Sequence, residues 1–277
     1  MQFSIITPSF RNSAWLKLCV PSVADQGIEL EHIVQDAGSD DGTLDWLPQD
    51  QRVKAFVEKD AGMYDAVNRG LRRATGELLA YLNCDEQYLP GALPAVTGFF
   101  KQNPSIEIVF GDTVVIDAAG KFVCYRKVQL PLKYHTWVSG NLSILTCAMF
   151  FRRSVIARHN LFFETRYRDL GDADWIMRAI KKRIPMAVLR RFTSAFTETG
   201  QNMNLLPNAQ REKREFIQSA PRWAQKLSSL FVVHHRLRRL VQGAYSQQPF
   251  AYSIYTRASA NQRVSFQVEH PTTRWVR

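Results

Sequence analysis

Short apolar runs and amphipathic segments alternate along the first 110 residues of the chain. The apolar runs have the length and composition of buried strands, whereas the segments between them carry apolar side chains at helical spacing. Met63, Val67 and Leu71 recur every four residues, for example, and predict a helix with one buried face. The predicted strands are Phe3–Thr7, His32–Asp36, Lys54–Glu58, Leu78–Leu82 and Ile106–Phe110, and the predicted helices are Trp15–Ala24, Met63–Arg73 and Leu89–Lys101.

This alternation predicts an α/β fold with a mainly parallel sheet and helices on both faces. Ligands bind such sheets at the carboxyl ends of the strands. Beyond residue 112 the pattern changes to a smaller, mixed β element and then to a basic, helix-compatible segment. We expect a hairpin with arms at 113–116 and 122–125, a strand at 146–152 and helices at 173–182 and within 211–242.

The chain is accordingly divided into an α/β domain, residues 1–210, and a basic, largely helical extension, residues 211–277. The domain has a first half, 1–112, and a second half, 113–210. The formal net charge is +11, and the extension holds 12 Lys and Arg against 3 Glu, which is +9 and leaves +2 for the domain. The basic character therefore belongs to the extension.

The four cysteines, Cys19, Cys84, Cys124 and Cys147, are widely spaced and form no CxxC pair. We expect buried, reduced thiols rather than a zinc site or a disulfide framework. No apolar run approaches the roughly 18 residues that a spanning helix requires, and the N-terminus leads directly into a predicted strand. The expected location is therefore cytoplasmic.

Two adjacent carboxylates follow the strand Leu78–Leu82, in the sequence Asn83-Cys84-Asp85-Glu86. Like charges side by side in a crevice repel each other unless a cation neutralises them. Mg²⁺ and Mn²⁺ prefer such oxygen ligands and can bridge to phosphate oxygens. The motif therefore predicts a divalent metal site at residues 83–86.

Asp36 ends another predicted strand and precedes the glycine-containing loop 37–43. A carboxylate at this edge can accept a hydrogen bond from a nucleobase or a ribose hydroxyl. The alternative is a tight turn in which Asp36 accepts only backbone N–H groups. Asp60 has a similar choice between capping the helix at Met63–Arg73 and contacting a ligand, and Asp65 is spaced to pair with Arg69 on the surface.

A second acidic cluster, Asp169, Asp172 and Asp174, lies where the helix at 173–182 should begin. Helix capping explains one of these carboxylates. Another could act as a general base that takes the proton of an acceptor hydroxyl. Spacing alone leaves both Asp172 and Asp174 open for this role.

Five motifs, in order, resemble those of the family 2 glycosyltransferases of GT-A fold, especially bacterial members that build surface polysaccharides. The resemblance covers about residues 1–200. The motifs are Ile5–Phe10, Gln35–Thr43, Glu58–Gly70, Ala74–Glu77 and Leu82–Glu86, and Asp172-Ala173-Asp174 with Arg178 matches a later acidic element.

The resemblance implies a GT-A (Rossmann-like) fold and an inverting transfer from a nucleoside diphosphate sugar, with a UDP-sugar favoured. The acceptor would be a hydroxyl of a saccharide or lipid-linked saccharide in polysaccharide biosynthesis. The first half would bind the nucleotide sugar and the second half the acceptor. The implied residues are Asp172 as base, with Asp174 as second choice, Asp85 for Mn²⁺ or Mg²⁺, and Pro8, Ser9, Asp36, Asp60, Asp65, Asn68 and Asn83 for the nucleotide sugar.

The sequence departs from the family pattern at two positions in the metal motif. Asn83 stands where many members have the first aspartate, and Glu86 replaces a frequent second aspartate. The ion would then be held by Asp85 together with phosphate and water oxygens, an arrangement that suits Mg²⁺.

The extension contains His234, His235, Arg236, Arg238 and Arg239 among apolar residues. A basic amphipathic helix of this kind can bind an anionic membrane surface, which would place the protein peripherally on the inner face of the membrane. The alternative is a helix packed on the catalytic domain with a solvated basic face.

Three other functions remain as alternatives. A basic nucleic-acid-binding protein is disfavoured because the predicted site is acidic, so we expect no nucleic-acid partner. A dinucleotide-dependent oxidoreductase lacks support, since no GxGxxG follows the first strand. A protein that binds a sugar nucleotide without turnover is compatible with the departures at Asn83 and Glu86.

Overall fold

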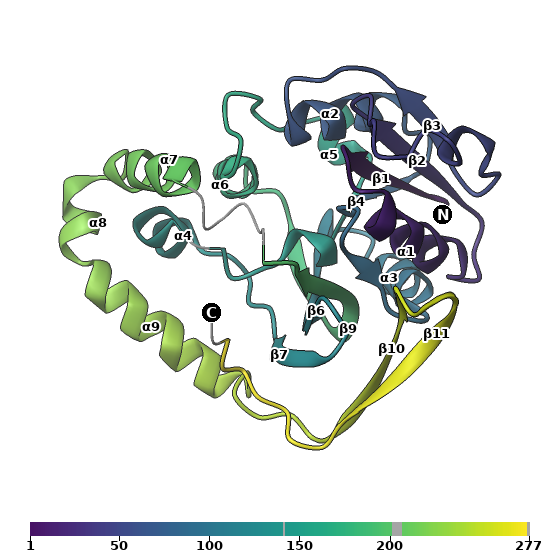
Figure 1. The fold of residues 1–277 in the computed structure, drawn as a ribbon. Coiled ribbons are helices and arrows are strands. Elements are labelled where there is room, and N and C mark those ends of the chain that lie inside the picture. The colour runs from purple at the N-terminus through teal and green to yellow at the C-terminus, as the bar shows by residue number, and fades with distance from the viewer. Residues whose placement is uncertain (141, 201–206, 276–277) are drawn as a thin grey trace.

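The computed structural model describes residues 1–140, 142–200 and 207–275. Within them, nine strands form one sheet in the order β3-β2-β1-β4-β8-β6-β9-β5, with β7 paired to β6. Helices cover both faces of this sheet (Figure 1). The strands are β1 (Phe3–Ser9), β2 (Leu30–Asp36), β3 (Lys54–Val57), β4 (Leu78–Tyr81), β5 (Gln87–Tyr88), β6 (Ile108–Asp117), β7 (Phe122–Arg126), β8 (Met149–Arg152) and β9 (Met186–Glu198).

The helices of the first half are α1 (Ser13–Ala24), the short 3₁₀ turn η1 (Leu47–Gln49), α2 (Met63–Arg73) and α3 (Ala92–Gln102). Those of the second half are α4 (Lys133–Ser139), η2 (Thr146–Ala148), α5 (Ser154–Ala157) and α6 (Gly171–Lys181). They are followed by α7 (Pro207–Gln218), α8 (Arg222–Lys226), α9 (Ser228–Val241) and a separate hairpin, β10 (Phe250–Thr256) and β11 (Ser259–Val268).

The sheet has a parallel part and a mixed part. Strands β3, β2, β1 and β4 are all parallel, as are β6 and β9. Strand β8 is antiparallel to both β4 and β6, and β7 forms the predicted hairpin with β6. The predicted α/β fold, with a mainly parallel sheet and a smaller mixed element, is confirmed.

Strand β1 separates two hydrophobic cores because successive side chains point to opposite faces. Ile5 belongs to the core beneath α1 and α3, and Ile6 to the core beneath α2 and α6. Gly70 allows α2 to lie close to β1, since a Cβ atom there would approach Cγ2 of Ile6 to 2.4 Å. Both faces are buried, which explains why these strands read as continuous apolar runs.

Several boundaries differ from the sequence prediction. Residues 146–148 form a 3₁₀ turn before β8, and the third helix begins at Ala92 because Gln87–Tyr88 pairs with β9 as a strand. Strand β9 and helix α4 were not anticipated. Strand β9 carries Arg190 and Arg191 in its centre, so its pattern lacks the apolar run that marked the other strands.

The C-terminal segment is helical only as far as Val241. Figure 1 shows α7, α8 and α9 as an arc at the end of the molecule opposite β2 and β3, after which the yellow hairpin β10–β11 returns toward α1. The Tyr255 hydroxyl donates to Asp25 at 2.9 Å, and Arg263 forms an ion pair with Asp25 at 2.6 Å. The extension is therefore fastened to the first half of the domain.

The division of the chain at residues 112 and 210 stays a prediction. The second boundary, at residue 210, falls inside α7, which begins at Pro207. The boundary was drawn from the change in charge, and that change begins a few residues after the start of the helix. None of the described helices is long and apolar enough to cross a membrane.

Candidate active site

The carboxyl ends of β1, β2 and β4 border a cavity of about 860 Å³, here called the strand-end cavity. The loop after β1, the turn after β2, the start of α2 and the loop after β4 form its walls. Pro8, Ser9, Asp60, Asn83 and Asp85 from the predicted set line it. The cavity therefore lies at the edge of the sheet where the sequence predicts a ligand site.

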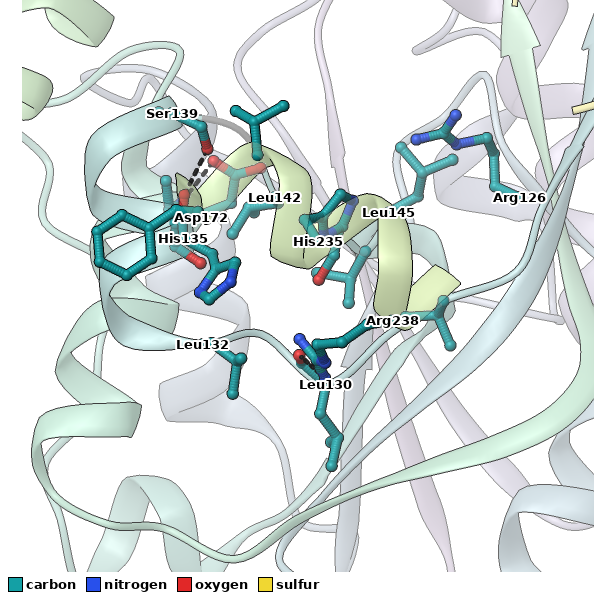
Figure 2. A pocket seen from close by; sticks show the side chains of 18 of the residues that line it. Arg126, Leu130, Leu132, His135, Ser139, Leu142, Leu145, Asp172, His235 and Arg238 are labelled. Carbon is teal, nitrogen blue, oxygen red and sulfur yellow. Dashed lines mark hydrogen bonds between the residues drawn. The ribbon is translucent and has the colours of Figure 1, made fainter. Parts of the chain in front are cut away.

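A second cavity, of about 610 Å³, lies beside it and is called here the α4–α9 cavity. Figure 2 shows side chains from α4, α6, α9 and the β7 region converging on it. Asp169 and Asp172 line both cavities, as do Ile144, Leu145 and Trp275. The two cavities therefore meet beside the second acidic cluster.

Asp85 and Glu86 both line the strand-end cavity. Burial raises the pKa of both carboxyls, and the neighbouring Asp85 raises that of Glu86 further. The backbone N–H of Asn83 donates to Glu86 at 2.9 Å, whereas Oδ1 of Asn83 is buried without a hydrogen-bond partner among the described residues. A cation at this position would relieve both the charge repulsion and the unpaired oxygen.

The described residues contain no group of three or more His, Cys, Asp or Glu side chains placed to hold a metal ion. Asp85 and the oxygen of Asn83 are nonetheless hard ligands at a shared wall of the cavity. Mg²⁺ often binds through one or two carboxylates and completes its shell with phosphate and water oxygens. The residues present fit an ion that arrives together with a diphosphate.

Cys84, in the middle of this motif, does not supply an oxygen ligand as Asp85 and Asn83 would. Cys84 accepts a hydrogen bond from Asn12 at 3.0 Å, and burial raises the pKa of its thiol well above the usual value. No disulfide joins the four cysteines, which all lie in the described part of the chain and are buried, as predicted.

Asp36 is buried and does not line the cavity. Its carboxylate accepts hydrogen bonds from the backbone of Gly38 and Ser39 at 2.9 and 2.7 Å, and from the hydroxyls of Ser9 and Ser39, both at 2.8 Å. This is the tight-turn alternative. Asp36 holds the loop on which Ser9 and Gly38 reach the cavity wall, and its direct contact with a ligand stays a prediction.

Asp60 lines the cavity and also accepts a hydrogen bond from the Gly62 backbone at 2.9 Å, while burial raises its pKa. Asp65 does not line the cavity. It pairs with Arg69 at 2.9 Å and accepts the Ala61 backbone N–H at 3.1 Å, so it holds the turn that precedes α2.

Asn68 is likewise absent from the cavity wall. Its amide donates to the Phe163 carbonyl at 2.8 Å and accepts the Phe163 N–H at 2.9 Å, deep in the protein. A contact between Asn68 and the donor stays a prediction. It joins α2 to the loop that precedes α6.

Asp172 and Asp174 occupy the first turn of α6, but only Asp172 lines the cavities. Burial raises the pKa of Asp172 to about 6. Asp174 forms an i,i+4 ion pair with Arg178 at 2.7 Å. The tertiary structure thus separates two carboxylates that the sequence left equivalent.

Tyr64 was not singled out from the sequence, although it lies within the motif Glu58–Gly70. Its hydroxyl accepts the N–H of Asp172 at 3.2 Å, and its ring stacks on Phe163 with centroids 5.3 Å apart. Gly171 makes room for the ring, since a Cβ atom there would lie 2.5 Å from Cε2 of Tyr64. The residue fixes the start of α6.

Helix α9 presents different side chains to the cavity and to solvent. His235 and Arg238 line the α4–α9 cavity, together with Arg126 of β7 and His135 of α4 (Figure 2). Arg236 of α9 also lines it. Apolar side chains at helical spacing remain exposed on α9 and just before it. They are Trp223, Leu227, Leu230, Val233, Leu237, Leu240 and Val241.

Comparison with known proteins identifies the family. The family model described as glycosyl transferase family 2 matches residues 4–159. The PGL/p-HBAD biosynthesis glycosyltransferase of Mycobacterium bovis is 29% identical over 236 residues, which cover 79% of this chain and 84% of the relative. The GalNAc(5)-diNAcBac-PP-undecaprenol beta-1,3-glucosyltransferase of Campylobacter jejuni is 31% identical over 121 residues, 41% of this chain and 38% of the relative.

Solved structures share the fold. S. aureus TarS 1-349 in complex with UDP-GlcNAc gives a TM-score of 0.61 at 16% identity and covers 87% of this chain and 73% of its own. The mannosyltransferase PcManGT from Pyrobaculum calidifontis, in complex with GDP-Man and Mn²⁺, gives 0.53 at 16% identity, covering 87% and 79%. With the family match over more than half of its length, the chain belongs to glycosyl transferase family 2 and is a glycosyltransferase.

Proposed function

We propose that this enzyme is an inverting glycosyltransferase that moves a sugar from a nucleoside diphosphate sugar to a hydroxyl of a saccharide or lipid-linked saccharide in polysaccharide biosynthesis. The observation that carries the proposal is the place of Asp172, which lines both cavities. A donor in the strand-end cavity and an acceptor in the α4–α9 cavity would meet beside this carboxylate.

The donor is assigned to the strand-end cavity, with a UDP-sugar favoured. Pro8, Ser9, Asp60 and Asn83 are proposed to contact the nucleotide sugar, since their side chains line the cavity. Asp36, Asp65 and Asn68 would act through the loops and helix that they hold. A structural neighbour was solved with UDP-GlcNAc, which supports this donor class.

Transfer would proceed as one in-line displacement. The carboxylate of Asp172 takes the proton of the acceptor hydroxyl, and the acceptor oxygen forms a bond to the anomeric carbon. The bond from that carbon to the diphosphate oxygen breaks, and its electron pair leaves with the nucleoside diphosphate. Attack opposite the leaving group inverts the anomeric configuration. Asp172 is favoured over Asp174 because the latter is paired with Arg178 outside the cavities.

Asp85 is the proposed protein ligand for Mn²⁺ or Mg²⁺, with Asn83 beside it. When bound, the ion would supply positive charge that stabilises the departing diphosphate. The fit of the carboxylate and the unpaired Asn83 oxygen supports this assignment. The complex of a structural neighbour with GDP-Man and Mn²⁺ is a further indication.

The exposed apolar side of α8 and α9 supports peripheral binding to an anionic membrane surface on the cytoplasmic side. Residues 216–268 contain seven Lys and Arg and no Asp or Glu, so the charge of this segment complements anionic headgroups. Leu230 and Leu237 are 60% and 54% exposed on α9. Burying such side chains in an interface contributes about 1.5–3 kcal/mol each.

The donor site is tested by thermal unfolding with UDP-, GDP- and dTDP-sugars, each with and without Mn²⁺. A donor at a hundredfold excess over its dissociation constant should stabilise the protein by about 2.7 kcal/mol, a shift of about 5 °C or more. Asp85→Ala should lose the metal-dependent part. Asp45→Ala, which removes an exposed carboxylate away from both cavities, should retain it.

Two results would contradict parts of this proposal. If no sugar nucleotide stabilises the native protein, the donor class is wrong. If Asp85→Ala keeps the full metal-dependent shift, the metal ligand is wrong. Donor binding without any release of the nucleoside diphosphate in the presence of acceptors would instead favour a binding protein without turnover.

A further inference from the structure

The α4–α9 cavity has an acidic end and a basic wall. Asp169 and Asp172 mark the end that joins the strand-end cavity, whereas α9 contributes His235, Arg236 and Arg238. Arg126 of β7 and His135 of α4 add to the basic lining from the α/β domain. The α9 part of the wall belongs to the extension, outside the residues 4–159 that match the family.

The two arginines of this wall have no carboxylate partner among the ion pairs of the described residues. Arg238 donates to the Leu130 carbonyl at 3.2 Å, which leaves its charge uncompensated, and Arg236 is exposed. No acidic residue occurs anywhere between positions 216 and 268. Helices α8 and α9 therefore contain no carboxylate that could neutralise the positive charge of the cavity wall.

Two histidines that line the cavity, His235 and His135, have lowered pKa values. Burial, followed by the charges of Arg239 and Arg238, lowers the pKa of His235. Burial and the neighbouring His234 lower the pKa of His135 to about 4. Both imidazoles are therefore neutral at pH 7 and can serve as hydrogen-bond donors or acceptors, while the arginines remain charged.

Guanidinium groups that face a cavity and have no carboxylate partner of their own are suited to phosphate. They bind it through paired, charge-assisted hydrogen bonds. The volume of about 610 Å³ lies within the range of about 300–1,000 Å³ found for small-molecule sites. A molecule that fills the cavity would contact Asp172 at one end and the arginines along the other wall.

We propose that the acceptor carries a phosphate or diphosphate group, which Arg236 and Arg238 bind while the reacting hydroxyl lies beside Asp172. The inference rests on the proposed function and specifies its acceptor class. Because α9 also exposes Leu230, Val233 and Leu237, the same helix would hold the phosphate of an acceptor anchored in the adjacent lipid surface. A water-soluble phosphate-bearing saccharide would offer the same chemistry.

The test is calorimetric titration of geranyl diphosphate, inorganic diphosphate and geraniol into the full chain, in EDTA and without nucleotide. Under these conditions no divalent ion is present to bridge a diphosphate to Asp85 in the strand-end cavity. Arg236→Gln/Arg238→Gln is compared with Arg222→Gln/Lys226→Gln. Both pairs remove two positive charges from the α8–α9 segment, but only the first pair lines the cavity.

We expect Arg236→Gln/Arg238→Gln to weaken geranyl diphosphate binding by about tenfold or more, the control pair to change it by less than about twofold, and geraniol not to bind. Tighter binding of geranyl diphosphate than of inorganic diphosphate indicates a lipid-linked acceptor, and equal binding indicates a water-soluble one. The proposal would be overturned if both double variants lost the same affinity for geranyl diphosphate, or if Arg236→Gln/Arg238→Gln lost none. It would also be overturned if neither diphosphate bound the native protein.

The donor experiment separates this inference from the proposed function. Arginine-dependent diphosphate binding without any stabilisation by sugar nucleotides would retain the anion site and reject the transfer reaction. Donor stabilisation that depends on Asp85, without diphosphate binding at α9, would retain the donor site and reject the phosphate-bearing acceptor.

Discussion

The hydroxyl oxygen of Tyr64 accepts a hydrogen bond from the backbone nitrogen of Asp172 across 3.2 Å. Tyr64 belongs to α2, whose first turn lines the strand-end cavity, and Asp172 belongs to the first turn of α6. This contact joins the two halves of the α/β domain at the junction of the two cavities. The proposed base is thus positioned by a residue of the motif that is proposed to bind the donor.

Tyr64→Phe should slow transfer while leaving donor binding intact. The change leaves the Asp172 N–H without its partner, at a cost of about 1–3 kcal/mol, and allows the start of α6 to move. We expect kcat to fall by about tenfold with an unchanged KM for the donor. Tyr167→Phe is the control, because within the described residues the Tyr167 hydroxyl has a hydrogen bond only from the neighbouring Arg166 side chain, at 3.4 Å. An unchanged kcat would show that the contact does not position the base.

Asp172→Asn should abolish most of the transfer activity because the amide cannot accept the hydroxyl proton. A loss of about 10²–10⁴-fold in kcat is expected, measured as release of nucleoside diphosphate with acceptor present. Asp174→Asn breaks the ion pair with Arg178 and should cost only about 0.5 kcal/mol of stability. If Asp174→Asn loses transfer and Asp172→Asn keeps it, the base assignment is reversed.

The rate of transfer should depend on pH through Asp172. Burial raises the pKa of this carboxyl to about 6. The base acts only when deprotonated, so kcat should be constant above about pH 7 and fall by about tenfold per pH unit below about pH 5. The profile is measured at saturating donor and Mn²⁺, so that weaker metal binding in acid does not contribute. A constant kcat between pH 5 and 7 would contradict this role.

Asn68→Ala should affect stability more than donor binding. The side chain makes two buried hydrogen bonds to the backbone of Phe163, at 2.8 and 2.9 Å. Their loss leaves two buried backbone groups unpaired and should lower the free energy of unfolding by about 2–4 kcal/mol. Denaturant unfolding and donor affinity are measured on the same sample. A stable variant with weakened donor affinity would instead support a direct contact.

Leu230→Ser/Leu237→Ser should weaken sedimentation with anionic vesicles by about tenfold or more, because both side chains are exposed and would insert into the interface. The fold should be unaffected, as judged by thermal unfolding. Val57→Ser removes an exposed apolar side chain on β3 and serves as the control. Equal sedimentation of the double variant and the native protein would exclude α9 as the membrane contact.

Much of the fold was predictable because its signals are local. The strands that begin at Phe3 and Leu78 are buried on both faces and read as apolar runs, and α2 shows its buried face at intervals of four residues. Strand β9 was missed because its partners are far away in sequence. It pairs with β6 about 80 residues earlier, and this pairing compensates for the arginines in its centre.

The candidate site also has features that follow from local sequence and features that depend on tertiary contacts. Chain order alone placed Asp85 directly after a buried strand and therefore at the ligand-binding edge of the sheet. It could not distinguish ligand contact from internal hydrogen bonding for Asp36 or Asn68, since that depends on which groups lie opposite these side chains. Ser9 and Ser39 surround Asp36, and Phe163 lies opposite Asn68.

The sequence by itself determined the α/β alternation, the acidic motifs and the basic extension, because spacing and composition specify elements and their ends. Only the tertiary structure decided that Asp172 faces the cavities while Asp174 is paired, and that α9 lines one cavity with Arg236 and Arg238. Asp172 and Asp174 lie on the same turn of α6, and their surroundings differ because of the elements that pack against that helix. Those partners, α2 for Asp172 and α4 for α9, are distant in the chain.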